Sequence, residues 1–247
     1  MKRKTFFLTI GTVVACMCIT IAQTDPYNTD AFAIEKTTVT HITNLNLTVW
    51  NITVKGQAGS KTPAPNGALD GAPVLGYVFP TSLSPTAVGF NKTEGILALA
   101  LTSHPDFDDT PLWDENSDSN YGNDGVVWHP HWVVLIQDER VDGGFSVKQF
   151  KKADTSVKLP PTNPGMPMYM DSPGFPVSTA NNSIQVTVPG YRMQNQTDFS
   201  FDAVTAFMKV NTSDKSLPML GVYRVYSVAS GDLSLPYKVE KKTQQFD

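Results

Sequence analysis

Alternation of apolar and polar residues is the main pattern along this chain. Residues 37–56, TTVTHITNLNLTVWNITVKG, alternate in this way and are rich in β-branched and aromatic side chains. Successive side chains of a β-strand point to opposite faces, so a period of two is typical of strands with one buried face. We therefore expect strand structure across this segment.

Seven further segments have the composition of strands, and turn clusters rich in Gly, Pro, Asn and Asp separate them. Helical periodicity is scarce, and its one contender, residues 202–209 (DAVTAFMK), lies inside one of these segments. The pattern predicts an all-β fold, an antiparallel β-sandwich or barrel-like domain with long irregular loops. The seven segments are residues 73–79, 95–103, 125–137, 144–150, 183–191, 199–210 and 219–228.

Two connecting segments are unusually long. Residues 57–72 are polar and rich in Pro and Gly, and residues 155–176 are rich in proline with little strand character. Long ordered loops either carry function or cover an open core. No internal repeat or break in composition divides the chain, so residues 23–247 are expected to form a single β-rich domain.

The N-terminal segment has the pattern of a secretory signal peptide. Lys2, Arg3 and Lys4 precede a mostly apolar run over residues 6–22, which ends in a small-x-small cleavage pattern at Ala22. An alternative interpretation is a lipidation box that ends at Cys16. Both predict an exported protein that is secreted, periplasmic or attached to the cell surface. No later segment approaches the ~20 apolar residues of a membrane span.

Removal of residues 1–22 changes the charge and the cysteine content. The chain has 19 basic and 23 acidic residues, and three basic residues leave with the signal, so 16 against 23 gives a net charge of −7. This balance argues against nucleic acid and anionic membranes as partners. Cys16 and Cys18 also leave, which excludes disulfides, a cysteine nucleophile and cysteine metal ligands. No protein partner is indicated.

An acidic segment suggests a site for a hard cation. Seven acidic residues and no basic one lie between residues 106 and 124: Asp106, Asp108, Asp109, Asp114, Glu115, Asp118 and Asp124. Within it, Asp114, Asn116, Asp118 and Asn120 offer oxygen ligands at alternate positions, and Asp124 is a candidate closing ligand. Because Ca²⁺ takes six to eight oxygens, we expect calcium here.

The acidic segment resembles an EF-hand loop only in part. Ser119 stands at the sixth position, where that loop has Gly, and Gly125 stands at the twelfth, where it has Glu. No flanking helices are predicted. The alternatives are a calcium loop between two strands and a solvated acidic turn.

Two histidines lie between two tryptophans in residues 128–132, WHPHW. On a strand, His129 and His131 share one face, and Trp128 and Trp132 lie on the other. Two imidazoles on one rigid element are a common way to bind Zn, Cu, Fe or Ni. Pro130 lacks an N–H, so the strand is expected at a sheet edge or at a bulge.

A third histidine, His104, ends the apolar segment that precedes the acidic loop. Strands close in sequence usually neighbour each other in space, so the loop is expected to bring His104 back to His129 and His131. Three histidines with one open position bind Zn²⁺ or copper. The alternative is that these histidines are ordinary surface residues of a strand.

Three methionines at alternate positions, Met166, Met168 and Met170, would share a face of an extended segment. Thioether sulfur favours Cu(I), which would place copper before zinc. The simpler interpretation, which we favour, is that they fill core space, as methionine often does.

Three functions follow from these patterns. The leading hypothesis is an exported metal-binding protein, with calcium in the acidic loop and copper or zinc on the histidines, in metal acquisition, storage or delivery. The second is an exported metal-dependent hydrolase with a three-histidine site. The third is a calcium-stabilised module in which exposed tryptophans bind a carbohydrate or a protein. A non-enzymatic role is favoured.

Overall fold

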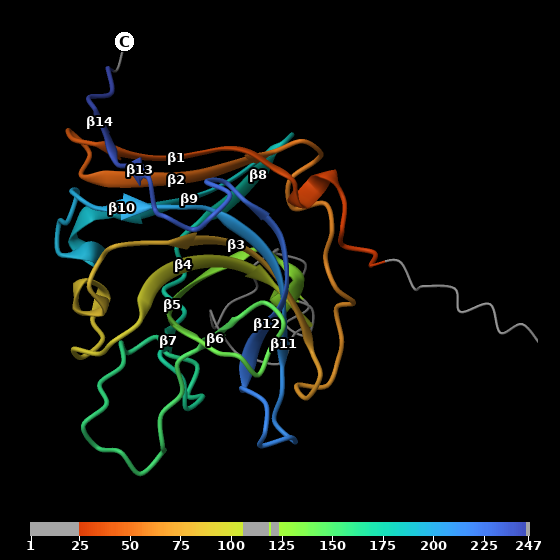
Figure 1. Cartoon of the computed structure of the whole chain (residues 1–247). Coiled ribbons are helices and arrows are strands. Elements are labelled where there is room, and N and C mark those ends of the chain that lie inside the picture. Colours follow the sequence, from red (N-terminus) through yellow and green to blue (C-terminus); the bar gives the residue numbers. More distant parts are fainter. Residues whose placement is uncertain (1–24, 106–118, 120–123, 246–247) are drawn as a thin grey trace, which may run out of the picture.

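The strands of this protein form a barrel and an open sheet that share one hydrophobic layer, as a computed structural model shows (Figure 1). The structure describes residues 25–105, 119 and 124–245. In this part of the chain all secondary structure is strand or short 3-10 helix, which confirms the predicted all-β class. The strands are β1 (Ile34–Ile42), β2 (Leu47–Val54), β3 (Pro73–Pro80), β4 (Ile96–Ser103), β5 (His129–Gln137), β6 (Phe145–Val147), β7 (Met170–Asp171), β8 (Val177–Ala180), β9 (Ser183–Pro189), β10 (Ser200–Phe201), β11 (Val204–Val210), β12 (Leu220–Val228), β13 (Tyr237–Lys238) and β14 (Glu240–Lys242). The 3-10 helices are η1 (Asp30–Phe32), η2 (Pro85–Val88), η3 (Asp124–Val126) and η4 (Gly190–Met193).

Six antiparallel strands close into the barrel. They follow the order β4-β3-β11-β12-β6-β5, and pairing between β4 and β5 completes the circle. The short β7 pairs with β5 at Val133 and Trp132. The sequence left a sandwich and a barrel as alternatives, and the structure contains a closed barrel with additional sheets.

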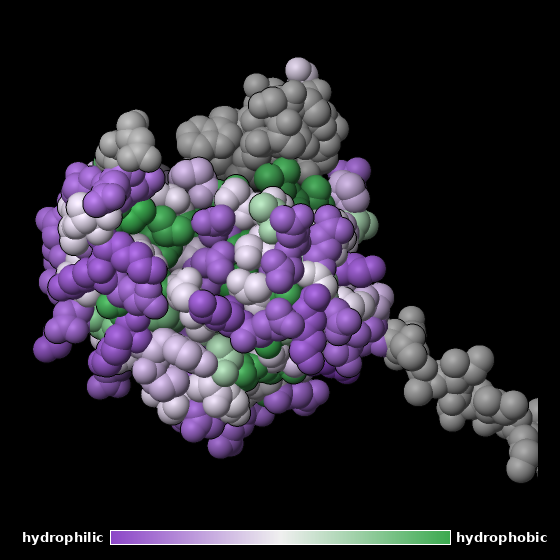
Figure 2. Space-filling view, turned by 90° about the horizontal axis from the view of Figure 1, so that it is seen from above, coloured by the Kyte–Doolittle hydropathy of each residue, from purple (hydrophilic) through white to green (hydrophobic). Residues whose placement is uncertain are grey.

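The open sheet has the order β14-β1-β2-β9-β8 and lies beside the barrel (Figure 1). Along β2, every second residue from Thr48 to Val54 is buried, and the residues between them are half-buried. This is the alternation seen in residues 37–56. Seen from above relative to Figure 1, hydrophilic residues cover much of the coloured surface of this face, and hydrophobic ones form smaller separate areas (Figure 2).

Strand β4 is buried on both faces because it faces two apolar layers. Leu97, Leu99 and Leu101 belong to the cluster between the barrel and the open sheet, whereas Ala98 and Ala100 belong to the cluster inside the barrel. A strand with two apolar faces gives a continuous apolar run instead of an alternating one. This explains the run in residues 95–103.

Residues 202–209, for which the sequence left a helix as an alternative, form strand β11 over most of their length. Ala206 and Met208 belong to the cluster inside the barrel, and β3 and β12 pair with β11 on its two sides. Pairing with two neighbours satisfies the backbone N–H and C=O groups that an isolated segment would satisfy as a helix.

The predicted signal segment, residues 1–22, lies outside the described residues, and so does Cys16. Export and the choice between cleavage and lipidation therefore stay predictions. Among the residues that the structure describes, no helix is both long enough and apolar enough to span a membrane.

Candidate metal centre

The pairing of β4 with β5 brings three histidines to one end of the barrel. In this pairing Thr102 lies opposite His129 and Ala100 lies opposite His131. His104 follows the last residue of β4, and its backbone N–H donates to the carbonyl of Gly125 at 2.9 Å. This contact lies outside the β4–β5 ladder, and it holds His104 against η3, which leads into β5.

The alternation along β5 separates histidines from tryptophans, as the sequence predicts. The side chain of His131 lines the barrel interior. Trp132 belongs to the layer between barrel and sheet, where its ring meets Trp50 edge to face at 5.9 Å. Trp128 lies in the same layer, 4.9 Å from the ring of Tyr77.

Both tryptophans are buried, Trp128 with 9% and Trp132 with 1% exposure. The hypothesis that exposed tryptophans hold a carbohydrate or a protein is therefore wrong for these two residues. They are buried because the open sheet packs against this side of β5. The residue pattern of β5 alone does not reveal that another sheet packs there. Trp128 also donates its indole N–H to the carbonyl of Gly59 at 3.0 Å.

Pro130 marks no bulge and β5 is not an edge strand as a whole, but among the described residues β5 has a strand on only one side at Pro130, so the expected edge position holds locally. β5 pairs with β4 from Ile96 to Thr102 without a shift of register, and it has β6 and β7 on its other side. The N–H of Val134 donates to the carbonyl of Tyr169, the residue before β7. Pro130 lies four residues earlier, so its backbone nitrogen faces the same side of β5. Pairing with β7 starts only at Trp132, so no ladder bond is lost at Pro130.

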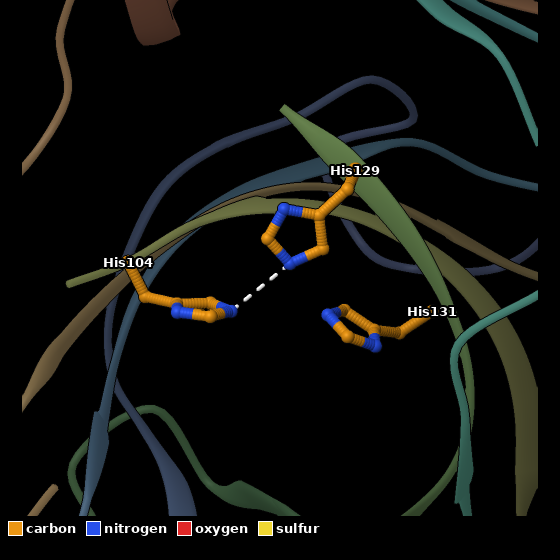
Figure 3. Close-up of side chains that lie close together, drawn as sticks. All are labelled: His104, His129 and His131. Atoms are coloured by element: carbon orange, nitrogen blue, oxygen red, sulfur yellow. Dashed lines mark hydrogen bonds between the residues drawn. The ribbon is translucent and has the colours of Figure 1, made fainter. Parts of the chain in front are cut away.

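The three imidazoles converge on a common point (Figure 3). Each ring offers one nitrogen, and these three nitrogens lie within 4.8 Å of one another. The ring centroids are 4.7 Å apart for His104 and His129, 4.8 Å for His129 and His131, and 6.2 Å for His104 and His131. All three residues are 3% exposed.

Carbonyl groups behind two of the rings fix their tautomers. The Nδ1 of His104 lies 2.8 Å from the carbonyl oxygen of Pro105, and the Nδ1 of His129 lies 2.6 Å from that of Val127. A carbonyl only accepts, so both Nδ1 atoms carry the hydrogen. In a ring that carries its hydrogen on Nδ1, the lone pair that can bind a cation is on Nε2.

The Nε2 atoms of His104 and His129 face each other at 3.0 Å. Two lone pairs at this distance repel unless a proton or a metal ion lies between them. Metal–nitrogen bonds of about 2.0–2.1 Å place two ligand nitrogens roughly 2.9–3.4 Å apart at bond angles of roughly 90–110°. The observed separation fits such a pair of ligands.

His131 is oriented by residues of the proline-rich loop. Its Nδ1 lies 2.8 Å from the hydroxyl oxygen of Ser172, and its ring also bonds to the backbone of Asp171. The hydroxyl of Thr102 lies 3.5 Å from Nε2 of His129. Such contacts orient metal-binding imidazoles. Sequence reasoning missed Ser172 and Thr102 as site residues; the one available signal was the length of loop 155–176.

Burial keeps the imidazoles of His129 and His131 neutral. Loss of hydration lowers the pKa of His129 to about 3, and the neighbouring His104 adds to the effect, while the Val127 carbonyl opposes it. Burial, followed by the charges of His129 and His104, lowers the pKa of His131 well below its ordinary value. Because only a neutral imidazole binds a metal, both rings are competent ligands at neutral pH.

These pKa shifts predict how the metal-free protein responds to acid. The pKa of His129 is 6.5 in the unfolded chain and about 3 in the fold, so the unfolded state binds more protons between these values. The free energy of unfolding is therefore highest above pH 6.5. Below that pH it decreases by about 1.4 kcal/mol per pH unit for each such histidine. Urea denaturation at pH 7.5, 6.5, 5.5 and 5 measures this slope.

The control is His129→Ala, whose slope over the same range should be smaller by about 1.4 kcal/mol per pH unit. A chelator keeps both proteins metal-free. Equal slopes in the two proteins would contradict the assignment of the acid response to His129.

The residues expected to bind calcium are not placed by the structure. Asp114, Asn116, Asp118 and Asn120 lie outside the described residues, and only the backbone of Asp124, at the start of η3, is described. The calcium loop therefore stays a prediction.

The methionines line the barrel interior. Met168 and Met170 are buried in its hydrophobic cluster, and the half-buried Met166 packs against that cluster. All three border the same cavity as His104 and His131. Their surroundings are those of core residues, as the simpler interpretation predicts.

The fold and the site define an all-β protein with a closed six-stranded barrel and a buried three-histidine group that could hold a metal ion. Comparison of the chain with known protein families, with curated proteins and with solved structures found no match. The three-histidine group is therefore the feature of this protein from which a function is inferred.

Proposed function

We propose that this protein binds one transition-metal ion, zinc or copper, through the Nε2 atoms of His104, His129 and His131. The observation that carries the proposal is the convergence of the three ring nitrogens within 4.8 Å in a buried site. The Nδ1 contacts support it, because they direct each Nε2 toward the common point. Three histidine ligands leave a further coordination position open.

The burial of the site favours a metal that stays with the protein over one that is delivered to a partner. Transfer requires that the ligands become accessible, and each of these histidines is 3% exposed. The N-terminal pattern of residues 1–22 supports export, so we place this role outside the cytoplasm. If Cys16 and Cys18 leave with the signal segment, imidazole is the main side-chain ligand left for zinc and copper.

Metal analysis of the purified protein tests the proposal. After equilibrium dialysis against zinc and, separately, copper, the wild-type protein is expected to retain about one ion per chain. His129→Ala and His131→Ala each remove one of three ligands and should lower the affinity more than the roughly 10–100-fold loss known for removal of an outer hydrogen-bond partner. Inductively coupled plasma mass spectrometry gives the stoichiometry.

His41→Ala is the matched control, because His41 is a buried histidine outside the site. It is 7% exposed on β1, and its Nδ1 lies 3.3 Å from the Thr48 hydroxyl. This variant should keep the wild-type stoichiometry. Wild-type protein that retains neither metal, or equal loss in all three variants, would end the proposal.

A second candidate function is metal-dependent hydrolysis. A zinc ion on three histidines lowers the pKa of a bound water to about 7 and so supplies a nucleophile at neutral pH. The observation that favours this function is a cavity in contact with His104 and His131, which gives a small molecule room beside the open coordination position.

A further inference from the structure

The barrel encloses a cavity of about 460 Å³ beside the histidines. Ligand-binding sites in proteins commonly measure 300–1,000 Å³ and are lined mainly by apolar side chains with a few polar groups. Residues from all six barrel strands and from the proline-rich loop line this cavity. It therefore has the size and setting of a small-molecule site.

Small residues facing the barrel interior leave space for the cavity. Ala100 and Ala206 contribute only methyl groups to the lining. Gly76 pairs with Ala206, and a Cβ at this glycine would lie 2.7 Å from the Cε of Met208. Native interiors are otherwise closely packed, so a cavity of this size in a small barrel indicates space reserved for an occupant.

The lining has five polar residues among its apolar ones: Thr102, His104, His131, Gln137 and Asp232. Thr102, His104 and His131 lie at one end of β4 and β5, and Gln137 lies at the other end of β5. Six residues separate His131 from Gln137, which corresponds to roughly 20 Å of strand. Apolar side chains line the space between, and none of the described lining residues is Lys or Arg. The cavity therefore suits an elongated, uncharged molecule.

The exposed lining residues include Gln137, which lies at the opposite end of β5 from His129 and His131. Val225 is 38% exposed, and Gln137 and Asp232 are exposed, whereas the histidines are buried. Asp232 carries a negative charge, because hydrogen bonds from Ser234 and Ser230 lower the pKa of its carboxyl. A ligand that enters past these residues meets an anion and no lining cation, which disfavours anionic molecules.

The loop at this entrance is held in a costly conformation. Leu233 and Leu235 both line the cavity, with φ values of 59° and 54° in the left-handed region. Leucine rarely adopts this conformation, and such residues often occur where a ligand is clamped. Ser230, at the start of the loop, hydrogen-bonds to the buried carboxylate of Asp202.

We propose that the barrel cavity binds an elongated, uncharged, apolar molecule with a single oxygen- or nitrogen-bearing end group, and that this group reaches the metal held by the three histidines. The molecule enters between Val225 and Asp232, and its apolar body lies along the barrel. This inference rests on the proposed metal site, which supplies the partner for the polar end. The expected ligands are long-chain alcohols, aldehydes, amides and similar neutral compounds.

Primary alcohols of increasing length test the inference. Isothermal titration calorimetry of the zinc-loaded protein with butan-1-ol, hexan-1-ol and octan-1-ol gives the affinity for each. Burial of each added methylene should tighten binding about fourfold, so octan-1-ol should bind roughly 250-fold more tightly than butan-1-ol. In cobalt-substituted protein, octan-1-ol should also shift the visible absorption bands, because its hydroxyl enters the coordination sphere.

Cavity-filling variants supply the controls. Ala206→Phe and Val222→Phe each fill the lining from a different strand and should abolish the dependence on chain length while metal content stays at the wild-type level. Ala206→Ser preserves the space and should keep that dependence. Circular dichroism identifies a variant that fails to fold, and the second filling variant then serves as the test.

The outcomes separate this inference from the metal site. If the protein binds zinc but its affinity for alcohols does not change with chain length, the inference is overturned and the metal site stands. The same holds if octan-1-ol leaves the cobalt absorption bands unchanged. Absence of bound metal would overturn both the metal site and the end-group contact. Tighter binding of longer alcohols to wild type, its loss in the filled variants and a cobalt shift would support the inference.

Discussion

Zinc at a hundredfold excess over its dissociation constant is expected to raise the free energy of unfolding of the metal-free protein by about 2.7 kcal/mol. Zinc stabilises the fold because the three imidazoles converge only in the folded chain, where pairing of β4 with β5 brings His104, just after β4, to His129 and His131. For a chain of this size, the gain corresponds to an increase of roughly 5–11 °C in the melting temperature. Differential scanning calorimetry at a series of zinc concentrations measures it.

The stabilisation by zinc should disappear in His131→Ala and persist in His41→Ala. Because binding adds to stability with the logarithm of zinc concentration, the melting temperature of the wild type should keep rising after the site is saturated. If zinc raised the melting temperature of His131→Ala as much as that of the wild type, the stabilising site would lie elsewhere.

Trp132→Ala is expected to lower the free energy of unfolding by about 3–5 kcal/mol, a cost typical of deleting a buried aromatic side chain. Trp132 is 1% exposed and packs against Trp50, which also contacts Phe79, Phe199 and Phe201. Deleting the indole leaves a void between the barrel and the open sheet. Urea denaturation followed by circular dichroism measures the loss.

Trp132 lies next to His131 in sequence but on the opposite face of β5, so the folded fraction of Trp132→Ala should still bind metal. Trp132→Phe should cost much less, because it keeps a ring and removes an indole N–H that has no hydrogen-bond partner among the described residues. Tyr191→Ala, at a side chain that is 69% exposed, should change stability by less than about 0.5 kcal/mol. A small loss in Trp132→Ala would contradict the core assignment.

Much of the fold was predictable because side-chain period and turn residues are local properties. Residues 37–56 alternate since β1 and β2 have one face against the core, and residues 95–103 form an apolar run since β4 is buried on both sides. The barrel was one of two alternatives, because closure depends on pairing between β6 and β12, and between β3 and β11, which are far apart in the chain.

The candidate site also has one part that the local sequence predicted and one part that depends on distant contacts. The spacing of His129 and His131 assigns them to one face of a strand, and the position of His104 before the same loop suggests that it joins them. Ser172 could not be foreseen, because it reaches His131 through the packing of loop 155–176 against β5. The burial of Trp128 likewise depends on the layer between the barrel and the open sheet.

The sequence by itself determined the all-β class, the face on which each β5 side chain lies, and which three histidines were candidates for one metal. These follow from a period of two and from residue chemistry, which need no knowledge of distant neighbours. Only the tertiary structure decided that the rings converge, that the tryptophans are buried and that a cavity extends from the histidines along the barrel. The reason is that ring separations, cover and enclosed space are set by contacts between strands that are remote in the chain.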